Sequence, residues 1–289
     1  MSWVSIDEEK CNGCGICVLR CPRCFIHSVE KIKVDANEKT CILCGHCVSL
    51  CPTEAVTHHK LNTSEFIKLG KETTFDTETF IQFLKERRSH RHFLDKKIPQ
   101  EDLEALIDVC RWAPTGSNVQ NVEMIVYQNQ DKIEKLSDLV IDYFIGLTDR
   151  VKKRLARLES EGKQNTEDYT FTLRLLDIGT NMSVAKASGL DPIFYKAPVL
   201  MIFHSIAQTS TPKDNSVLIA HTLALTARTM GIESCYIGLM EIAANDHPPI
   251  VKELNLPLDH KVFSSMVLGY PKLKFLTTVD RKPLKVRWE

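Results

Sequence analysis

The chain of 289 residues carries 37 lysines and arginines against 37 aspartates and glutamates, so its formal net charge is zero. This balance gives no basic excess and no acidic tail, and we expect no nucleic-acid partner. No apolar run approaches the roughly twenty residues of a membrane helix, so we expect no membrane partner. The length exceeds one small domain and leaves room for a second domain with its own core.

Eight of the eleven cysteines follow one pattern written twice, C-x2-C-x2-C-x3-C-P, with an offset of thirty residues. In this pattern the first three thiolates of each run hold one [4Fe-4S] cube, while the fourth ligates the other cube. The first set is therefore Cys11, Cys14, Cys17 and Cys51, and the second set is Cys41, Cys44, Cys47 and Cys21. Both sets predict a protein that moves single electrons.

Zinc and disulfides explain the same cysteines less well. Structural zinc uses two C-x2-C pairs separated by about fifteen to twenty residues, not three closely spaced thiolates plus a fourth. A disulfide framework needs an oxidising compartment. The opening residues MSWVSIDE contain no basic segment leading into an apolar one, so we expect no signal peptide and a cytoplasmic location.

The segment at residues 1–60 resembles a bacterial two-cluster ferredoxin along its whole length. The resemblance predicts a ferredoxin domain with two [4Fe-4S] clusters. Cys24, close behind the first run, is interpreted as a small buried packing residue. The pair His58 and His59, which ends the segment, is most simply exposed.

The pattern of polar and apolar residues changes after this segment. Residues 61–75 are polar and are interpreted as a linker, and residues 76–289 as a second domain. Helical spacing predicts one helix capped by Thr77 or Thr79 and another that begins near Pro99 and ends at Pro114. Further patterns predict strands at 122–127, 199–204 and 262–268, and helices at 132–139 and 215–230. This domain is expected to be α+β, with more helix than strand.

Residues 143–177 carry no readable pattern, and we assign them no chemistry. The part at 150–163 places Leu155 and Leu158 among many charges, which predicts a solvent-facing helix rather than a docking patch. The insertion is a candidate cap over a pocket.

Three segments of the second domain suggest a bound cofactor. The basic run R-R-S-x-R-x-F at 87–93 suits a phosphate ester, because guanidinium groups bind phosphate through paired hydrogen bonds, although such runs are more often surface charge. The segment A-P-T-G-S-N-x-Q at 113–120 follows a helix stopped by proline and leaves backbone N–H groups for a planar heterocycle, or is an ordinary loop. The segment G-I-E-S-C-Y-I-G at 231–238 permits a close backbone approach.

The order of these segments, followed by Arg281 and Lys282, resembles the nitroreductase family of FMN enzymes over roughly residues 76–289. The resemblance implies an α+β FMN domain behind the ferredoxin-like domain. It implies that the first motif and the late basic pair hold the FMN phosphate, the loop contacts the ribityl chain and pyrimidine edge, and the last glycine faces the reactive side of the ring. The implied contacts are Arg87, Arg88, Ser89, Arg91, Pro114, Thr115, Gly116, Asn118, Tyr236, Ile237, Gly238, Arg281 and Lys282. The family often has proline where Asn121 stands, which leaves the path of the loop open.

The resemblance further implies a homodimer with each flavin at the subunit interface, and an arm at 273–289 that wraps the partner. No G-x-G-x-x-G motif follows a predicted strand, so no separate dinucleotide-binding domain is expected. No residue is expected to act as a covalent nucleophile, because the flavin carries the chemistry.

Three functional hypotheses follow. In the first, a low-potential donor such as ferredoxin passes electrons through two [4Fe-4S] clusters to FMN and on to a nitroaromatic, quinone or similar electron-poor acceptor. In the second, NAD(P)H reduces the flavin and the clusters export electrons to a protein partner. In the third, the clusters serve a non-catalytic redox sensor, although no DNA-binding motif accompanies them.

Overall fold

The computed structural model describes residues 2–28, 32–70 and 76–289. The chain divides into two compact units, Met1–Asp76 with Ser117–Val119 and Thr77–Gly116 with Gln120–Glu289. The last part of the predicted linker, residues 71–75, lies outside the described residues. The proposed boundaries at 1–60, 61–75 and 76–289 stay predictions.

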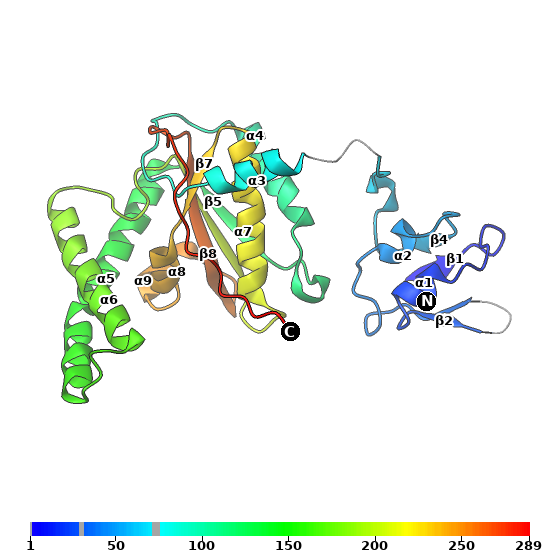
Figure 1. Ribbon diagram of the computed structural model, residues 1–289, viewed down its shortest axis with the longest axis horizontal. Helices are drawn as coiled ribbons and strands as arrows, with labels where there is room; N and C mark the ends of the chain where they lie inside the picture. Colours follow the sequence, from blue (N-terminus) through cyan, green and yellow to red (C-terminus); the bar gives the residue numbers. More distant parts are fainter. Residues whose placement is uncertain (1, 29–31, 71–75) are drawn as a thin grey trace. The chain divides into compact units, whose positions relative to one another are not determined.

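The first unit is built from two similar halves (Figure 1). The first half contains β1 (Val4–Ile6), α1 (Ile16–Arg20) and β2 (Phe25–His27), and the second contains β3 (Ile32–Val34), α2 (His46–Ser49) and β4 (Val56–His58). A short 3-10 helix, η1 (Thr63–Glu65), follows. β1 pairs with β4 and β2 with β3, both antiparallel. Each helix is preceded by a glycine with φ of 70°, Gly15 or Gly45, in the left-handed region that favours glycine.

A small core holds the first unit together. Val4, Phe25 and Val56 from three of the strands are buried in it, together with the thiols of Cys24 and Cys47. Cys24 is 1 % exposed and its Sγ donates a hydrogen bond to the Thr40 carbonyl at 3.3 Å, which confirms the interpretation as a buried packing residue.

The second unit is organised around a four-stranded sheet. Its order is β5 (Glu123–Tyr127), β6 (Val199–Ile206), β8 (His260–Gly269) and β7 (Glu233–Tyr236), with all neighbours antiparallel. β6 is apolar on both faces because helices cover both sides of the sheet. Its residues alternate between two cores, since successive side chains of a strand point to opposite faces.

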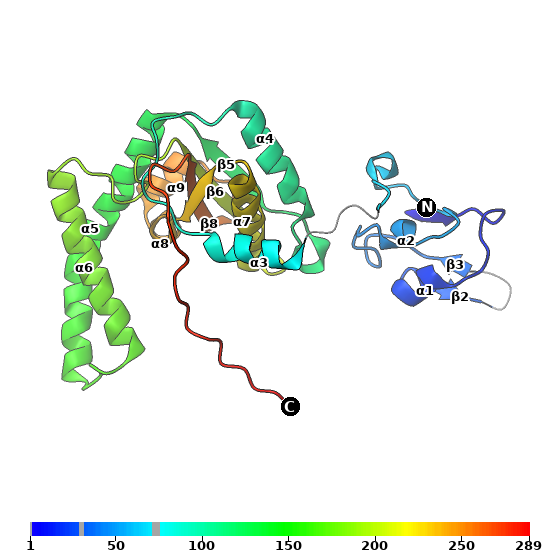
Figure 2. The ribbon, with the colours of Figure 1, turned by 45° about the horizontal axis from the view of Figure 1, so that its top comes forward.

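Helices form a layer on each face of this sheet (Figure 1, Figure 2). Val199, Met201 and Phe203 face the core that includes α4 (Gln100–Val109) and α7 (Pro212–Thr229). Leu200 and Ile202 face the opposite core. That core includes α5 (Gln130–Ser160), α8 (Gly238–Ala244) and α9 (Pro248–Leu254). The α+β architecture expected from the sequence is confirmed.

The remaining helices lie beside these layers. α3 (Thr77–Glu86) precedes the basic run, and the short 3-10 helices η2 (Cys110–Trp112) and η3 (Gly116–Asn118) follow α4. The predicted short helix at 132–139 is wrong in length, because α5 continues for 31 residues. It forms a hairpin with α6 (Glu167–Ala187), seen side by side in both views (Figure 1, Figure 2). Leu155 and Leu158 are buried, so the segment at 150–163 is solvent-facing on one side only.

The chain after β8 leaves the sheet as an extended arm. Residues 270–272 run beside residues 92–94, with Leu94 N–H donating to the Tyr270 carbonyl and Lys272 N–H to the His92 carbonyl. Beyond them, residues 273–289 form no helix or strand and are exposed (Figure 2). Among the described residues, no helix is long and apolar enough to cross a membrane.

Candidate cofactor sites

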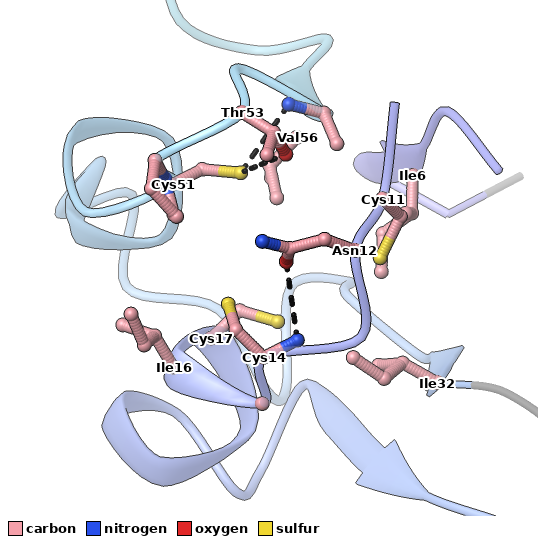
Figure 3. A pocket seen from close by; sticks show the side chains of 13 residues that line it. Ile6, Cys11, Asn12, Cys14, Ile16, Cys17, Ile32, Cys51, Thr53 and Val56 are labelled. Atoms are coloured by element: carbon pink, nitrogen blue, oxygen red, sulfur yellow. Dashed lines mark hydrogen bonds between the residues drawn. The ribbon is translucent and has the colours of Figure 1, made fainter. Parts of the chain in front are cut away.

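One cavity in the first unit collects the first thiol set (Figure 3). Cys11, Cys14, Cys17 and Cys51 all line it, among apolar side chains that include Ile6, Ile16, Ile32 and Val56. The fourth thiol comes from the other half of the unit because the pairing of β1 with β4 brings the end of the second run to the first. Soft thiolates in apolar surroundings are the ligands of iron–sulfur clusters, so these residues fit such a group.

Hydrogen bonds distinguish the fourth thiol of this set. Burial raises the pKa of Cys17, and the neighbouring thiols of Cys11 and Cys14 raise it further. For Cys51, burial also acts upward, but hydrogen bonds from Thr53 and from backbone N–H groups lower its pKa overall. The Ala55 N–H donates to Cys51 Sγ at 3.2 Å. Such donors stabilise negative charge on sulfur, which favours a thiolate ligand.

The second thiol set is also brought together. Burial raises the pKa of Cys47 to about 11, and the nearby thiols of Cys44, Cys41 and Cys21 add to the shift. These three thiols therefore lie near enough to Cys47 to act on it electrostatically. Iron binding would displace the thiol protons, since metal ligands bind as thiolates.

His58 belongs to the surroundings of the second set, although its sequence position suggested exposure. It is 2 % exposed, whereas His59 is exposed as expected. The Lys60 N–H donates to His58 Nδ1 at 3.2 Å, and His58 Nε2 lies 3.4 Å from Cys41 Sγ. Period-two alternation in β4 would have found it, because Val56 and His58 share the buried face while Thr57 is exposed.

In the second unit, the basic run lies along β7. His90 N–H donates to the Ser234 carbonyl at 3.0 Å. Burial raises the pKa of Cys235, while the Arg91 guanidinium and a hydrogen bond with Ser89 oppose that shift. The Arg91 guanidinium carbon lies 5.8 Å from the centre of the Tyr195 ring. The run is therefore held in a built environment rather than spread over the surface.

Two predicted cofactor contacts in this region have buried polar atoms without a hydrogen-bond partner among the described residues. They are Arg88 Nε and Tyr236 Oη. Burial raises the pKa of Tyr236 to about 12, with Arg87 acting in the opposite direction. The hydroxyl is therefore protonated at neutral pH. Buried donors without a partner are costly, so this site fits a ligand with negatively charged or carbonyl oxygens.

Sequence reasoning missed Arg228 at the end of α7. Its Nη2 lies 2.7 Å from Glu86 Oε2, and its guanidinium carbon lies 5.0 Å from the centre of the Phe83 ring. Its Nη1 is another buried atom without a partner in the part of the chain that the structure describes. Only its place in the last turn of α7, before Gly231, hinted at a role at this end of the sheet.

The loop at 113–120 is tightly built. Gly116 N–H donates to Asn215 Oδ1 at 2.8 Å, so this N–H is already paired within the protein. A Cβ at Gly116 would lie 2.3 Å from Thr211 Oγ1, which explains the glycine. Ser117 and Asn118 have φ of 52° and 54°, a strained conformation for residues with side chains. Thr115 Oγ1 accepts from Gln120 N–H at 3.1 Å, and Pro114 precedes this turn.

The remaining predicted contacts divide into two groups. Tyr236 ends β7, and Ile237 and Gly238 lead into α8, where both backbone groups of Ile237 are bonded to Ser265. Arg281 and Lys282 are exposed on the C-terminal arm. Within the described residues they form no hydrogen bond or ion pair. The single chain therefore does not bring them into a site.

Comparison with known proteins agrees with both units. A model of the nitroreductase family matches residues 84–270, and a model of a 4Fe-4S dicluster domain matches residues 3–52. A 4-nitrobenzoate reductase from Pseudomonas putida is 27% identical over 201 residues, which cover 67% of this chain and 86% of that protein. A chloronitrobenzene nitroreductase from Comamonas testosteroni is 24% identical over 207 residues, covering 67% and 88%.

The fold has a solved counterpart. The crystal structure of a nitroreductase with bound FMN from Bacteroides fragilis covers 72% of this chain and 98% of its own, with a TM-score of 0.54 and 21% identity. At this identity the likeness shows the shared fold.

Proposed function

This chain belongs to the nitroreductase family and carries an N-terminal ferredoxin-like domain, and from this premise we propose a path for its electrons. The chain is an iron–sulfur flavin oxidoreductase. A low-potential donor delivers electrons to two [4Fe-4S] clusters, and the electrons pass through FMN to a nitroaromatic, quinone or similar electron-poor acceptor. The first cluster is held by Cys11, Cys14, Cys17 and Cys51, and the second by Cys41, Cys44, Cys47 and Cys21.

One observation carries this proposal. The four thiols of the first set surround a single cavity, in a chain whose other unit has the nitroreductase fold. The fourth thiol is the crossed Cys51, the arrangement typical of a domain with two cubes, so the geometry supports a pair of clusters. In the alternative path, in which NAD(P)H reduces the flavin, the same clusters would serve to export electrons.

The second unit provides the binding groups for FMN. When bound, FMN exchanges electrons singly with iron–sulfur clusters and in pairs with organic acceptors. The guanidinium groups of Arg87, Arg88 and Arg91 and the hydroxyl of Ser89 suit its phosphate. The Tyr236 hydroxyl donates to a ligand oxygen. The loop with Thr115 and Asn118 and the turn at Gly238 border the ring.

The chain acts as a homodimer in this proposal. The arm at 273–289 exposes Leu276, Leu284 and Trp288, each about nine-tenths exposed. Because these side chains gather on one extended segment, a second copy of the chain that receives the arm would bury them together. The same arm carries Arg281 and Lys282, so a partner that receives the arm also receives this basic pair.

The test is an anaerobic titration of the protein loaded with clusters and FMN. Reduced ferredoxin, NADH and NADPH are added in separate experiments, and the cluster and flavin absorbance bands are followed separately. We expect reduced ferredoxin to bleach the clusters first and the flavin second. A nitroaromatic added afterwards should restore the oxidised flavin band.

The other outcomes separate the alternatives. Rapid flavin bleaching by NADH or NADPH, followed by the clusters, would mean that the clusters export electrons. A reduced flavin that no nitroaromatic or quinone reoxidises would exclude the proposed acceptors. A Cys51→Ser variant that keeps flavin reduction by ferredoxin at the unaltered rate would exclude the proposed path.

A further inference from the structure

Three residues with metal-binding side chains meet on neighbouring strands of the second unit. Glu123 begins β5 and pairs directly with His204 on β6. His204 pairs with Val262 on β8, and His260 lies two residues before Val262. Directly opposed and diagonal positions on neighbouring strands share one face of the sheet. The sheet register therefore brings the three side chains together from positions far apart in the sequence.

The ligand atoms converge. The Nδ1 atoms of His204 and His260 are 2.9 Å apart. Glu123 Oε1 lies 3.9 Å from the other ring nitrogen of His260, Nε2, so the carboxylate must move toward Nδ1 to share an ion with it. One ligand atom from each residue can be chosen so that all three lie within 4.8 Å of one another. The proposed flavin and iron–sulfur sites use none of these residues. The group of Glu123, His204 and His260 therefore has no role in the proposed redox function.

Burial separates the two kinds of ligand. His204 is 4 % exposed and the His260 side chain 6 %, whereas the Glu123 side chain is 57 % exposed. Burial lowers the pKa of His204, and Glu123 partly opposes this while His260 adds to it. Two buried imidazoles beside a carboxylate at the surface offer nitrogen and oxygen ligands to a metal ion.

We propose that Glu123, His204 and His260 form a zinc site. Two imidazole nitrogens and one carboxylate oxygen are a common zinc ligand set, with water completing the tetrahedron. Tetrahedral geometry with Zn–N bonds of 2.0–2.1 Å requires nitrogen atoms about 3.3 Å apart, so the two rings need to separate by only about 0.4 Å. The exposed carboxylate has the freedom to close onto the ion.

Such an ion would tie β5, β6 and β8 together at one end of the sheet. Next to this point, Ser205 Oγ donates to the Asn121 carbonyl at 3.1 Å, and Asn121 directly follows the 113–120 loop. The zinc would therefore fix the start of β5, where the predicted flavin loop ends. The competing explanation is a hydrogen bond between the two imidazole rings, which needs no ion.

The test uses the protein with its clusters and FMN in place, so that the cysteines are occupied. Zn²⁺ alone is titrated by isothermal calorimetry, and bound zinc is measured by elemental analysis after gel filtration. We expect one zinc per chain, with affinity weakened at least about tenfold in Glu123→Gln and more in His260→Gln. His247→Gln, a half-buried histidine of the same unit, is the control and should keep the affinity.

Glu123→Gln keeps the test decisive even if a histidine variant fails to fold, because Glu123 is exposed and its replacement is nearly isosteric. The cluster absorbance is recorded throughout the titration. Zinc uptake with unchanged cluster absorbance and weaker binding in Glu123→Gln supports the site. An absence of zinc uptake, equal affinity in wild type and Glu123→Gln, or uptake only as the cluster absorbance falls would overturn it.

Discussion

At the scale of single residues, His58 is the side chain with the clearest influence on the proposed second cluster. Its Nδ1 accepts from the Lys60 N–H, and burial, followed by His59, lowers its pKa and favours the neutral ring. The proton of the neutral ring is therefore on Nε2, which faces Cys41 Sγ at 3.4 Å. A hydrogen bond to a ligand sulfur stabilises the more negative, reduced state of a cluster.

We expect His58→Leu to lower the reduction potential of one cluster by roughly 60 mV, a tenfold change for a one-electron couple. The measurement is a redox titration followed by electron paramagnetic resonance. His59→Leu is the matched control because His59 is an exposed neighbour of His58. If the reduction potentials of both clusters are unchanged in His58→Leu, the Nε2 proton does not reach Cys41 Sγ.

The second prediction concerns the unpaired hydroxyl of Tyr236. Its removal should weaken FMN binding without destabilising the flavin-free protein. Tyr236→Phe should weaken FMN binding about tenfold, equivalent to about 1.4 kcal/mol, because a donor to the ligand is lost. The free energy of unfolding of the flavin-free protein should stay the same or rise by up to about 1 kcal/mol, since a buried unpaired group is removed. Flavin fluorescence titration and urea unfolding give the two quantities.

Tyr143→Phe is the control for these expected effects on FMN affinity and stability. The Tyr143 hydroxyl donates to Asp246 Oδ2 at 2.8 Å, so its removal should cost about 1 kcal/mol of stability and leave FMN affinity unchanged. Loss of stability in flavin-free Tyr236→Phe would mean that the hydroxyl has a partner within the protein.

At the scale of elements, the sequence predicted the strands whose own residues show that they are buried. The run at 199–204 became β6, and the strand predicted at 262–268 became β8, because each is largely apolar and buried on both faces. The extent of α5 was not predictable from its own residues. Its second half is highly charged, and Leu155 and Leu158 are buried in the hairpin with α6 rather than against the sheet.

The sites also divide into those that local sequence predicts and those that depend on residues far apart in the chain. Cysteine spacing alone predicts the two thiol sets, since ligand spacing is local in each run and the fourth ligand crosses to the other set, and this grouping stays a prediction. The hydrogen bond from the Gly116 N–H to Asn215 was not predictable from the loop, because Asn215 lies 99 residues away. Arg228 and the group of Glu123, His204 and His260 depend on sheet register and helix packing in the same way, so no motif marks them.

At the scale of the whole molecule, the proposed homodimer depends on the C-terminal arm. Replacing Leu276, Leu284 and Trp288 together by serine should weaken a homodimer at least about a hundredfold, since each buried apolar side chain contributes roughly 1.5–3 kcal/mol. Sedimentation equilibrium measures the change. Leu258→Ser, at a position equally exposed in the single chain, is the control and should leave the dimer intact. A triple variant that dimerises with unaltered affinity would show that the arm is not covered by a partner.

The pairing of β1 with β4 also imposes an order on biosynthesis. Val4 pairs with His58, so β1 has no strand partner until the ribosome has added more than fifty further residues. At about 5–20 residues per second this interval lasts roughly three to ten seconds. For much of this interval the nascent chain contains Cys11, Cys14 and Cys17 but not yet Cys51. Delivery of iron and sulfide to the first set is therefore a late event in the synthesis of this domain, and the early thiols must stay reduced until then.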